Sequence, residues 1–309
     1  MKILVTGSHG MVGQNILENS NIQQYDIMRP LSSELNLLNY IDVENYLRNN
    51  KPEMVIHCAG KVGGIQANIK NMYGFFWENA IMGINLVRAS KENNIKNFLN
   101  LSSSCAYPRN YKNPLKEEYI LQGELEPTNE GYALAKLSIQ KMCEYISKEN
   151  PDFQYKTMIP CNLYGRWDKF DEQNSHMIPS VIKKIHNAIK SNIETIEIWG
   201  DGTARREFMY ASDLASAVVK AIKEFDKIPV IMNIGLGFDY SINDYYETIK
   251  NILGYKGNFV YDLSKPSGMK QKLLDITRQT EWGWKPQINL QDGIYKTYQF
   301  YLEHYNDQV

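Results

Sequence analysis

The first half of the chain alternates short, largely apolar segments with longer segments of helical periodicity, and this alternation is its most restrictive feature. The strand-like segments are Lys2–Thr6, Tyr25–Met28, Met54–His57, Asn97–Leu101 and Tyr155–Ile159. The helical segments between them are Met11–Asn19, Ile41–Asn49, Asn71–Asn93 and Gly131–Lys148. Apolar strands separated by helices are typical of parallel sheets covered on both faces. The sequence therefore predicts an α/β fold with a Rossmann-type doubly wound parallel sheet, which binds ligands at the carboxyl ends of its strands.

A glycine-rich loop with the sequence GSHGMVG follows the first strand-like segment and opens the first helical one. Glycine lets the chain turn sharply and brings backbone N–H groups close to a pyrophosphate, while the helix N-terminus adds partial positive charge. The GxxGxxG spacing between a strand and a helix favours a dinucleotide site over an ordinary turn. The candidate cofactor residues of this loop are Gly7, His9, Gly10, Met11 and Val12.

Arg29 directly follows the second strand-like segment, where dinucleotide-binding proteins usually read the adenosine ribose. An acidic residue there favours the free 2′-hydroxyl of NAD, whereas an arginine accommodates the 2′-phosphate of NADP. The alternative interpretation is a solvated surface charge. We predict NADPH as the cofactor and include Arg29 among the candidate cofactor residues.

The pattern changes after about residue 163, where glycine and proline separate shorter segments and tryptophan and tyrosine become frequent. This change predicts a smaller, mixed α/β lobe for the substrate. We place the NADP(H)-binding Rossmann domain at residues 1–165, with later segments at about 205–235 returning to it. The substrate lobe is placed mainly at residues 166–309.

The charge balance and the cysteines argue against several classes of protein. The 34 lysines and arginines and 35 aspartates and glutamates give a net charge of -1, so neither nucleic acid nor an anionic membrane is expected as the main partner. No run of 18 apolar residues is present to span a membrane. The four cysteines form no CxxC pair, which argues against a disulfide framework and a bound metal and favours a cytoplasmic protein.

Tyr132 and Lys136 lie at the start of an alanine-rich helical stretch. Their spacing places the phenol and the ammonium on one helical face, where the cation is expected to lower the pKa of the phenol. A bare YxxxK pattern also arises by chance as a surface pair. However, the three serines at residues 102–104 follow a strand-like segment, where a hydroxyl can hydrogen-bond a substrate oxygen beside Tyr132. Together with the glycine loop, these features indicate a short-chain dehydrogenase/reductase of the extended type.

Longer motifs carry a more specific resemblance. They are SSCAYP at residues 103–108, LQGELEPTNEGYALAK at 121–136, NLYG at 162–165, NSHMIP at 174–179 and WGDGTARREF at 199–208, with AGKVGGIQAN at 59–68 and KQKLLD at 270–275. These motifs resemble GDP-L-fucose synthase, the GDP-4-keto-6-deoxymannose epimerase/reductase family, over nearly the whole chain. The resemblance implies that a GDP-bound 4-keto sugar is epimerised at C3 and C5 and then reduced at C4 by NADPH.

By this resemblance Ser103, Tyr132 and Lys136 are the reductase residues, and Cys105 and His176 are the base and acid of epimerisation. The assignment is chemically reasonable. A proton beside a ketone is acidic because the resulting carbanion spreads onto the oxygen as an enolate, and a thiolate and an imidazole both exchange protons near neutral pH. From residue type alone, Cys105 is equally well a small buried hydrophobic residue and His176 a hydrogen-bonded loop histidine.

The resemblance also implies ligand contacts and a partner. It adds Ala59, Lys136, Asn162 and His176 to the cofactor site and assigns Asn162, Lys184, Trp199, Arg206 and Lys272 to the GDP-sugar. The cations are suited to a diphosphate, whereas Trp199 is equally compatible with a core position. A homodimer through the helical stretches at residues 71–93 and 131–148 is expected on the same grounds, as is a role in making a sugar for surface polysaccharide.

The chain departs from the family pattern near both ligands. Ser8 and His9 stand where the family commonly has His-Arg, so one arginine that helps to read the 2′-phosphate is missing. Lys184 replaces a typical arginine and keeps the charge without the bidentate fork. A GDP-4-keto-heptose therefore stays open as the substrate, and so does C4 reduction alone after a separate epimerase.

Three other functions are disfavoured. Nucleotide-sugar 4,6-dehydratases use an Asp-Glu pair where this chain has Ser104 and Cys105, and the Cys105 and His176 pair is not the pattern of a UDP-sugar 4-epimerase. A non-catalytic NADP-sensing protein is the alternative from a different class. Such proteins tend to lose the catalytic tyrosine or lysine, and both are present here.

Overall fold

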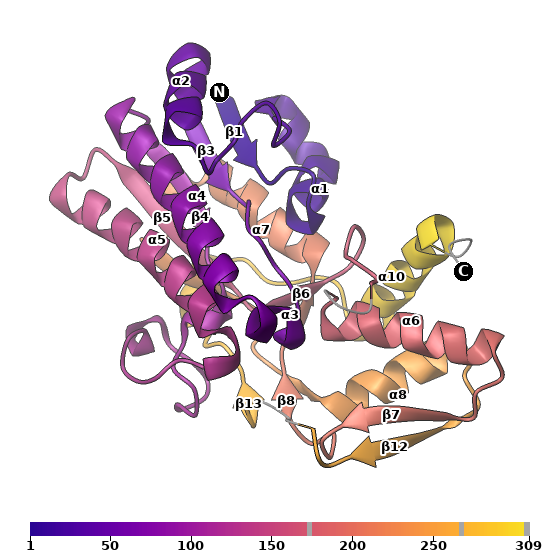
Figure 1. Cartoon of the computed structure of the whole chain (residues 1–309). Helices are drawn as coiled ribbons and strands as arrows, with labels where there is room; N and C mark the ends of the chain where they lie inside the picture. Colours follow the sequence, from indigo (N-terminus) through magenta and orange to yellow (C-terminus); the bar gives the residue numbers. More distant parts are fainter. Residues whose placement is uncertain (172–174, 266–268, 306–309) are drawn as a thin grey trace.

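The computed structural model describes residues 1–171, 175–265 and 269–305, so Asn174 of the NSHMIP motif lies outside the described residues. A six-stranded parallel sheet with the order β10-β5-β4-β3-β1-β2 forms the centre of the molecule (Figure 1). Its strands are β1 (Lys2–Thr6), β2 (Asp26–Met28), β3 (Met54–His57), β4 (Asn97–Leu101), β5 (Gln154–Pro160) and β10 (Ile231–Ile234). The predicted Rossmann-type α/β fold is confirmed. The structure begins β2 one residue later than expected and extends β5 by one residue at each end.

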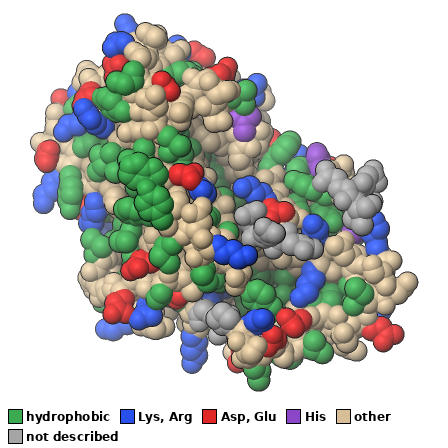
Figure 2. Space-filling model, in the orientation of Figure 1, with side chains coloured by type: hydrophobic (Ala, Val, Ile, Leu, Met, Phe, Trp, Pro, Cys, Tyr) green, Lys and Arg blue, Asp and Glu red, His purple; other side chains and the backbone are tan. Residues whose placement is uncertain are grey.

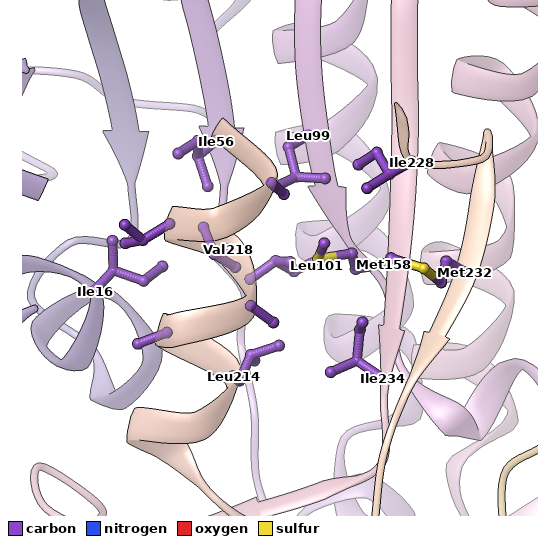
Figure 3. Packing of buried hydrophobic residues seen from close by; sticks show 14 of the residues in the cluster. Ile16, Ile56, Leu99, Leu101, Met158, Leu214, Val218, Ile228, Met232 and Ile234 are labelled. Carbon is purple, nitrogen blue, oxygen red and sulfur yellow. The ribbon is translucent and has the colours of Figure 1, made fainter. Parts of the chain in front are cut away.

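Helices cover both faces of this sheet because its strands are apolar on both sides. The covering helices are α1 (Met11–Glu18), α2 (Tyr40–Asn50), α4 (Met72–Glu92), α5 (Glu130–Glu149) and α7 (Ala211–Lys223). Successive residues of a strand point to opposite faces. Ile3 and Val5 accordingly pack in the core with α1 and α7, whereas Leu4 packs in the core with α2, α4 and α5. Figure 3 shows the first of these cores, with Val218 of α7 and Ile16 of α1 against the sheet.

A smaller lobe carries a second hydrophobic core (Figure 1). It contains the parallel pair β7 (Thr195–Trp199) and β12 (Asn258–Asp262), packed with α6 (Met177–Lys190), α8 (Ile242–Leu253) and α10 (Leu290–Tyr305). Short strands form two more small sheets. One pairs β6 (Asn162–Tyr164) with β9 (Phe208–Tyr210), and the other places β8 (Arg205–Arg206) between β11 (Tyr240–Ser241) and β13 (Gln271–Lys272). A short helix, α9 (Thr277–Glu281), follows β13.

The chain crosses between the two lobes more than once. Strand β10 pairs with β5 at the edge of the main sheet, and α7 packs against α1. Leu274 and Trp284, from the last part of the chain, also join the core of the main sheet. On this packing we propose a Rossmann domain at residues 1–165, completed by about 205–235, and a substrate lobe formed mainly by residues 166–309.

Asn71, the first residue of the helix expected at residues 71–93, lies just outside that helix as its N-cap. Its side chain accepts a hydrogen bond from the backbone N–H of Gly74, which caps the start of α4 at Met72. An additional helix, α3 (Ile65–Lys70), ends at the same asparagine and is not predicted from the sequence. None of the described helices is long and apolar enough to cross a membrane.

Candidate active site

A cavity of about 1060 Å³ lies between the carboxyl ends of the central strands and the smaller lobe. Figure 2 shows the molecule hollowed between its two lobes. The expected site residues that line the cavity are Gly7, His9, Gly10, Met11, Val12, Ala59, Ser103, Cys105, Tyr132, Lys136, Asn162, His176, Lys184, Trp199, Arg206 and Lys272. Arg29 is exposed and does not line it, although the next residues, Pro30 and Leu31, do.

The glycine loop is shaped to receive a pyrophosphate. Gly7 has a φ of +69°, and a Cβ atom there would lie 2.6 Å from the backbone of Ala59, so the turn requires glycine. A Cβ atom on Gly13 would lie 2.4 Å from the carbonyl oxygen of Gly7, so α1 packs closely on the loop. Gly10 begins α1 without a side-chain cap, which leaves backbone N–H groups of the first turn available to an anion. This loop fits the diphosphate of a dinucleotide such as NADP(H).

Tyr132 and Lys136 lie one turn apart on α5. The Lys136 ammonium lies 5.9 Å from the centre of the Tyr132 ring and donates a hydrogen bond of 3.0 Å to the carbonyl oxygen of Leu101. Burial lowers the pKa of Lys136 to about 8. Burial raises the pKa of Tyr132, Cys105 raises it further, and a hydrogen bond with Ser103 lowers it. The expected lowering of the phenol pKa by the lysine is therefore wrong, because desolvation of the phenol dominates.

The three serines after β4 have different environments. Ser102 is buried and donates a hydrogen bond of 3.3 Å to the Gln140 side chain. Ser104 is also buried, at the start of a short 3-10 helix. Ser103 hydrogen-bonds Tyr132, and its hydroxyl oxygen accepts the backbone N–H of Cys105 at 3.2 Å. Of the three hydroxyls, that of Ser103 is therefore the one placed to act with the phenol on a substrate oxygen.

Cys105 is half-buried, and its sulfur accepts hydrogen bonds from two nitrogen donors. The Asn129 amide nitrogen lies 3.1 Å from the sulfur and the Lys272 ammonium lies 3.6 Å from it. These polar contacts favour a chemical role for Cys105 over a purely hydrophobic one.

His176 begins α6 at the cavity wall, and its side chain makes no capping hydrogen bond. Burial, and to a smaller extent Lys169, lower the pKa of His176. The partial positive charge of the helix N-terminus also disfavours a protonated ring at this position. His176 therefore lines the cavity, and its side chain is not the cap of a helix.

The cations expected to bind the diphosphate are partly desolvated. Burial lowers the pKa values of Lys184 and Arg206, and Lys184 donates a hydrogen bond of 2.6 Å to the carbonyl oxygen of Glu197. Arg206 in β8 is paired in register with Lys272 in β13. A bound anion would offset the cost of burying these charges. Trp199 is 46% exposed and lines the cavity, so its alternative placement in the core is wrong.

Proteins of known activity are similar to this chain over its whole length. Residues 3–235 match the NAD dependent epimerase/dehydratase family. A GDP-L-colitose synthase of Yersinia pseudotuberculosis is 56% identical over 99% of this chain and 100% of its own length. A GDP-L-fucose synthase of Azorhizobium caulinodans is 48% identical over 97% of this chain and 96% of its own. The chain belongs to the GDP-L-fucose synthase family. The resemblance inferred from the motifs is confirmed.

Solved structures of this wider group share the architecture. A GDP-6-OMe-4-keto-L-xylo-heptose reductase from C. jejuni is 31% identical and superposes with a TM-score of 0.89, over 98% of this chain and 97% of that one. MlghC, a GDP-mannoheptose C4 reductase from Campylobacter jejuni with NADP bound, is 32% identical with a TM-score of 0.86, over 97% and 98% of the two chains.

Glu207 is a residue of the site region that sequence reasoning does not single out. It is buried, and its carboxylate accepts hydrogen bonds from the backbone N–H groups of Leu236, Gly237 and Leu274. Its own carbonyl oxygen accepts a hydrogen bond of 3.0 Å from Asn162. Burial raises the pKa of Glu207 to about 7. The Glu207 carboxylate thus connects the segments around β8, β10 and β13. In the sequence, the feature that could have drawn attention to Glu207 is a charged residue directly before an apolar strand.

Proposed function

We propose that this member of the family is an NADPH-dependent reductase of a GDP-4-keto sugar that also epimerises C3 and C5. The observation that carries the proposal is one cavity shared by the glycine loop, the hydrogen-bonded Ser103 and Tyr132, and the pair Cys105 and His176. The names of the similar proteins support the same substrate class: GDP-L-colitose synthase, GDP-L-fucose synthase, a reductase of a GDP-4-keto-heptose and a GDP-mannoheptose C4 reductase. NADP in one of those reductases supports the cofactor.

In the reduction step, Tyr132 and Ser103 hold the oxygen of the C4 ketone by hydrogen bonds. When bound, NADPH would supply the hydride for C4. The Tyr132 hydroxyl gives its proton to the ketone oxygen, which becomes the hydroxyl of a secondary alcohol. The raised pKa of Tyr132 keeps the phenol protonated at neutral pH, so the acid is in place at the start of the step. Lys136 then stabilises the resulting tyrosinate until it regains a proton.

In the epimerisation step, the Cys105 thiolate removes a proton from the carbon beside the ketone, and the C–H electron pair moves to form an enolate. Tyr132 and Ser103 stabilise the enolate oxygen by hydrogen bonds. Protonated His176 then donates a proton to the opposite face of the same carbon. Burial lowers the pKa of His176, so the ring must first gain a proton, and once protonated it gives that proton up readily.

A 6-deoxyhexose is the sugar that we propose. The two relatives that share 56% and 48% of their residues with this chain are named for colitose and fucose, which are 6-deoxyhexoses that differ at C3. The heptose reductases share only 31% and 32%. We further propose a cytoplasmic location, where free thiols and NADPH are maintained, and a role in making a sugar for surface polysaccharide.

The proposal is tested by supplying NADPH with GDP-4-keto-6-deoxymannose, its 3-deoxy analogue or a GDP-4-keto-heptose. We expect NADPH oxidation, followed at 340 nm, with at least one of the two deoxyhexoses, and an inverted C5 centre in the product by NMR. Oxidation only with the heptose and no inversion would support the alternative of a C4 reductase alone. NADPH binding without oxidation of any of the three would instead support the non-catalytic sensing protein.

Arg29 is proposed to read the 2′-phosphate, because it is exposed beside the cavity-lining residues Pro30 and Leu31. We expect Arg29→Ala to raise the KM for NADPH about tenfold, the loss of one charge-assisted contact, and to leave the KM for NADH unchanged. Arg48→Ala, an exposed arginine on α2, is the matched control and should change neither value. If Arg29→Ala changed the KM values for NADPH and NADH equally, residues other than Arg29 would bind the 2′-phosphate.

An exposed apolar surface on α4 and α5 supports the expected homodimer. Figure 2 shows hydrophobic side chains gathered over these two helices. Tyr73 is 74% exposed and stacks on Trp77, which is 48% exposed, while Leu134 and Tyr145 of α5 are 41% and 55% exposed. Surfaces of this kind commonly mark protein interfaces. We propose that a second copy of the chain covers this surface through the same two helices.

Trp77→Glu should convert the dimer to a monomer, because it places a carboxylate in the centre of the apolar surface. The measurement is molar mass by light scattering during gel filtration. Tyr295→Glu on α10, which is 55% exposed, is the control and should remain dimeric. A monomeric unmodified protein at micromolar concentration would contradict the dimer, as would a dimer that survives Trp77→Glu.

A further inference from the structure

Two residues from distant parts of the chain donate hydrogen bonds to the sulfur of Cys105. Asn129 lies directly before α5, three residues ahead of Tyr132, and its amide nitrogen is 3.1 Å from the sulfur. Lys272 comes from β13, and its ammonium approaches the same sulfur to 3.6 Å. Both groups are donors only at these atoms, so the sulfur acts as the acceptor. A thiolate is a much better acceptor than a thiol, and both contacts favour it.

Among the described residues, the Cys105 sulfur is the acceptor recorded for the Lys272 ammonium. The side chain is 9% exposed, and in the described part of the chain no carboxylate forms a salt bridge with it. A buried ammonium is costly unless an anion lies beside it. The Cys105 sulfur is the group that Lys272 contacts. Deprotonated sulfur would therefore compensate a charge that the fold has already placed there.

The Asn129 side chain has a second polar atom, its carbonyl oxygen. This oxygen is buried and has no hydrogen-bond partner among the described residues, and Asn129 lines the cavity. A buried unpaired acceptor is costly, and a hydrogen bond from a ligand hydroxyl would remove that cost. With its nitrogen on the sulfur and its oxygen free, the amide is placed to link the base to a substrate hydroxyl.

From these contacts we propose that Asn129 and Lys272 are positioning residues that hold Cys105 as a thiolate, ready to remove a proton from the sugar. The proposal rests on the proposed role of Cys105 as the base. Under this proposal, Lys272 stabilises the Cys105 sulfur in the substrate-free protein. The resemblance to the family instead places Lys272 at the diphosphate of the GDP-sugar. The proposal also gives a function to Asn129, which no pattern in the sequence singles out.

The thiolate is measured by alkylation with iodoacetamide at pH 7, with the modified Cys105 peptide quantified by mass spectrometry. In the full, substrate-free protein we expect Lys272→Met to slow alkylation of Cys105 at least about tenfold, because only the thiolate reacts. Asn129→Asp should slow it comparably, because a carboxylate replaces the donor. Lys272→Arg keeps the cation and should recover part of the rate. Lys270→Met, an exposed lysine two residues away, is the matched control and should be unchanged.

Unchanged alkylation in both Lys272→Met and Asn129→Asp would overturn the proposal. Thermal unfolding reports whether each variant is folded. If only one of the two variants is folded, its rate of Cys105 alkylation decides the question. Turnover adds a second test: at saturating GDP-4-keto sugar, Lys272→Met should lower the rate of solvent deuterium exchange. If Lys272 binds only the diphosphate, KM rises and that saturated rate stays the same, which also overturns the proposal. If the unmodified protein exchanges no deuterium, the epimerase part of the proposed function fails, and the alkylation result still tests the thiolate separately.

Discussion

Tyr132→Phe should lower NADPH oxidation with a GDP-4-keto sugar by about 10²–10⁴-fold, the usual contribution of a general acid, while NADPH binding stays unchanged. The phenylalanine ring keeps the packing beside Lys136 but cannot give a proton to the C4 oxygen or hydrogen-bond Ser103. Oxidation is followed at 340 nm, and binding is followed by the quenching of protein fluorescence. A loss confined to turnover would place the effect in the chemical step.

Tyr107→Phe is the matched control for this variant. Tyr107 also lines the cavity, but its hydroxyl donates a hydrogen bond of 2.6 Å to the buried Asn233 side chain. We expect its loss to lower the free energy of unfolding by about 1 kcal/mol and to leave turnover nearly unchanged. If Tyr132→Phe retained the turnover of the unmodified protein, another group would have to protonate the alkoxide.

Cys105→Ser should abolish deuterium incorporation from solvent at C3 and C5, with a loss of at least about 10²-fold. A serine hydroxyl stays protonated at neutral pH, so it accepts no proton from the carbon beside the ketone. Reduction should continue because Ser103 and Tyr132 are intact, and the product should keep the stereochemistry of the substrate at C5. Mass spectrometry and NMR of the product measure both outcomes.

Cys58→Ser provides the control, because Cys58 lines the same cavity and burial raises its pKa to about 12. That thiol is protonated at neutral pH, so we expect deuterium exchange to be unaffected by its replacement. Exchange that persisted in Cys105→Ser and disappeared in Cys58→Ser would move the base to the other cysteine.

Much of the fold could be predicted because its signals are local. A parallel strand buried on both faces is apolar throughout, a dinucleotide loop requires glycine at fixed positions, and a pair four residues apart on a helix shares one face. These rules located β1, the loop from Gly7 to Gly13, and the positions of Tyr132 and Lys136 on α5. They also predicted the order of strands and helices through β5, with the exception of α3.

The electrostatics of the site could not be predicted in this way. The cation beside Tyr132 is expected to lower its pKa, but the phenol is buried and desolvation raises the pKa instead. Similarly, residue types do not show that Ser103, and not Ser102, hydrogen-bonds Tyr132, or that Trp199 is exposed. Burial depends on what the rest of the chain places around a side chain.

The sequence by itself determined the α/β architecture, the glycine loop and the family, and it predicted a set of candidate residues for the chemistry. Only the tertiary structure decided which of these side chains meet. Lys272 and Cys105 are separated by 167 positions along the chain and lie 3.6 Å apart, and Glu207 joins segments that no periodicity connects. The physical reason is that short-range patterns fix local conformation, whereas the charge state of a group depends on neighbours that packing brings from anywhere in the chain.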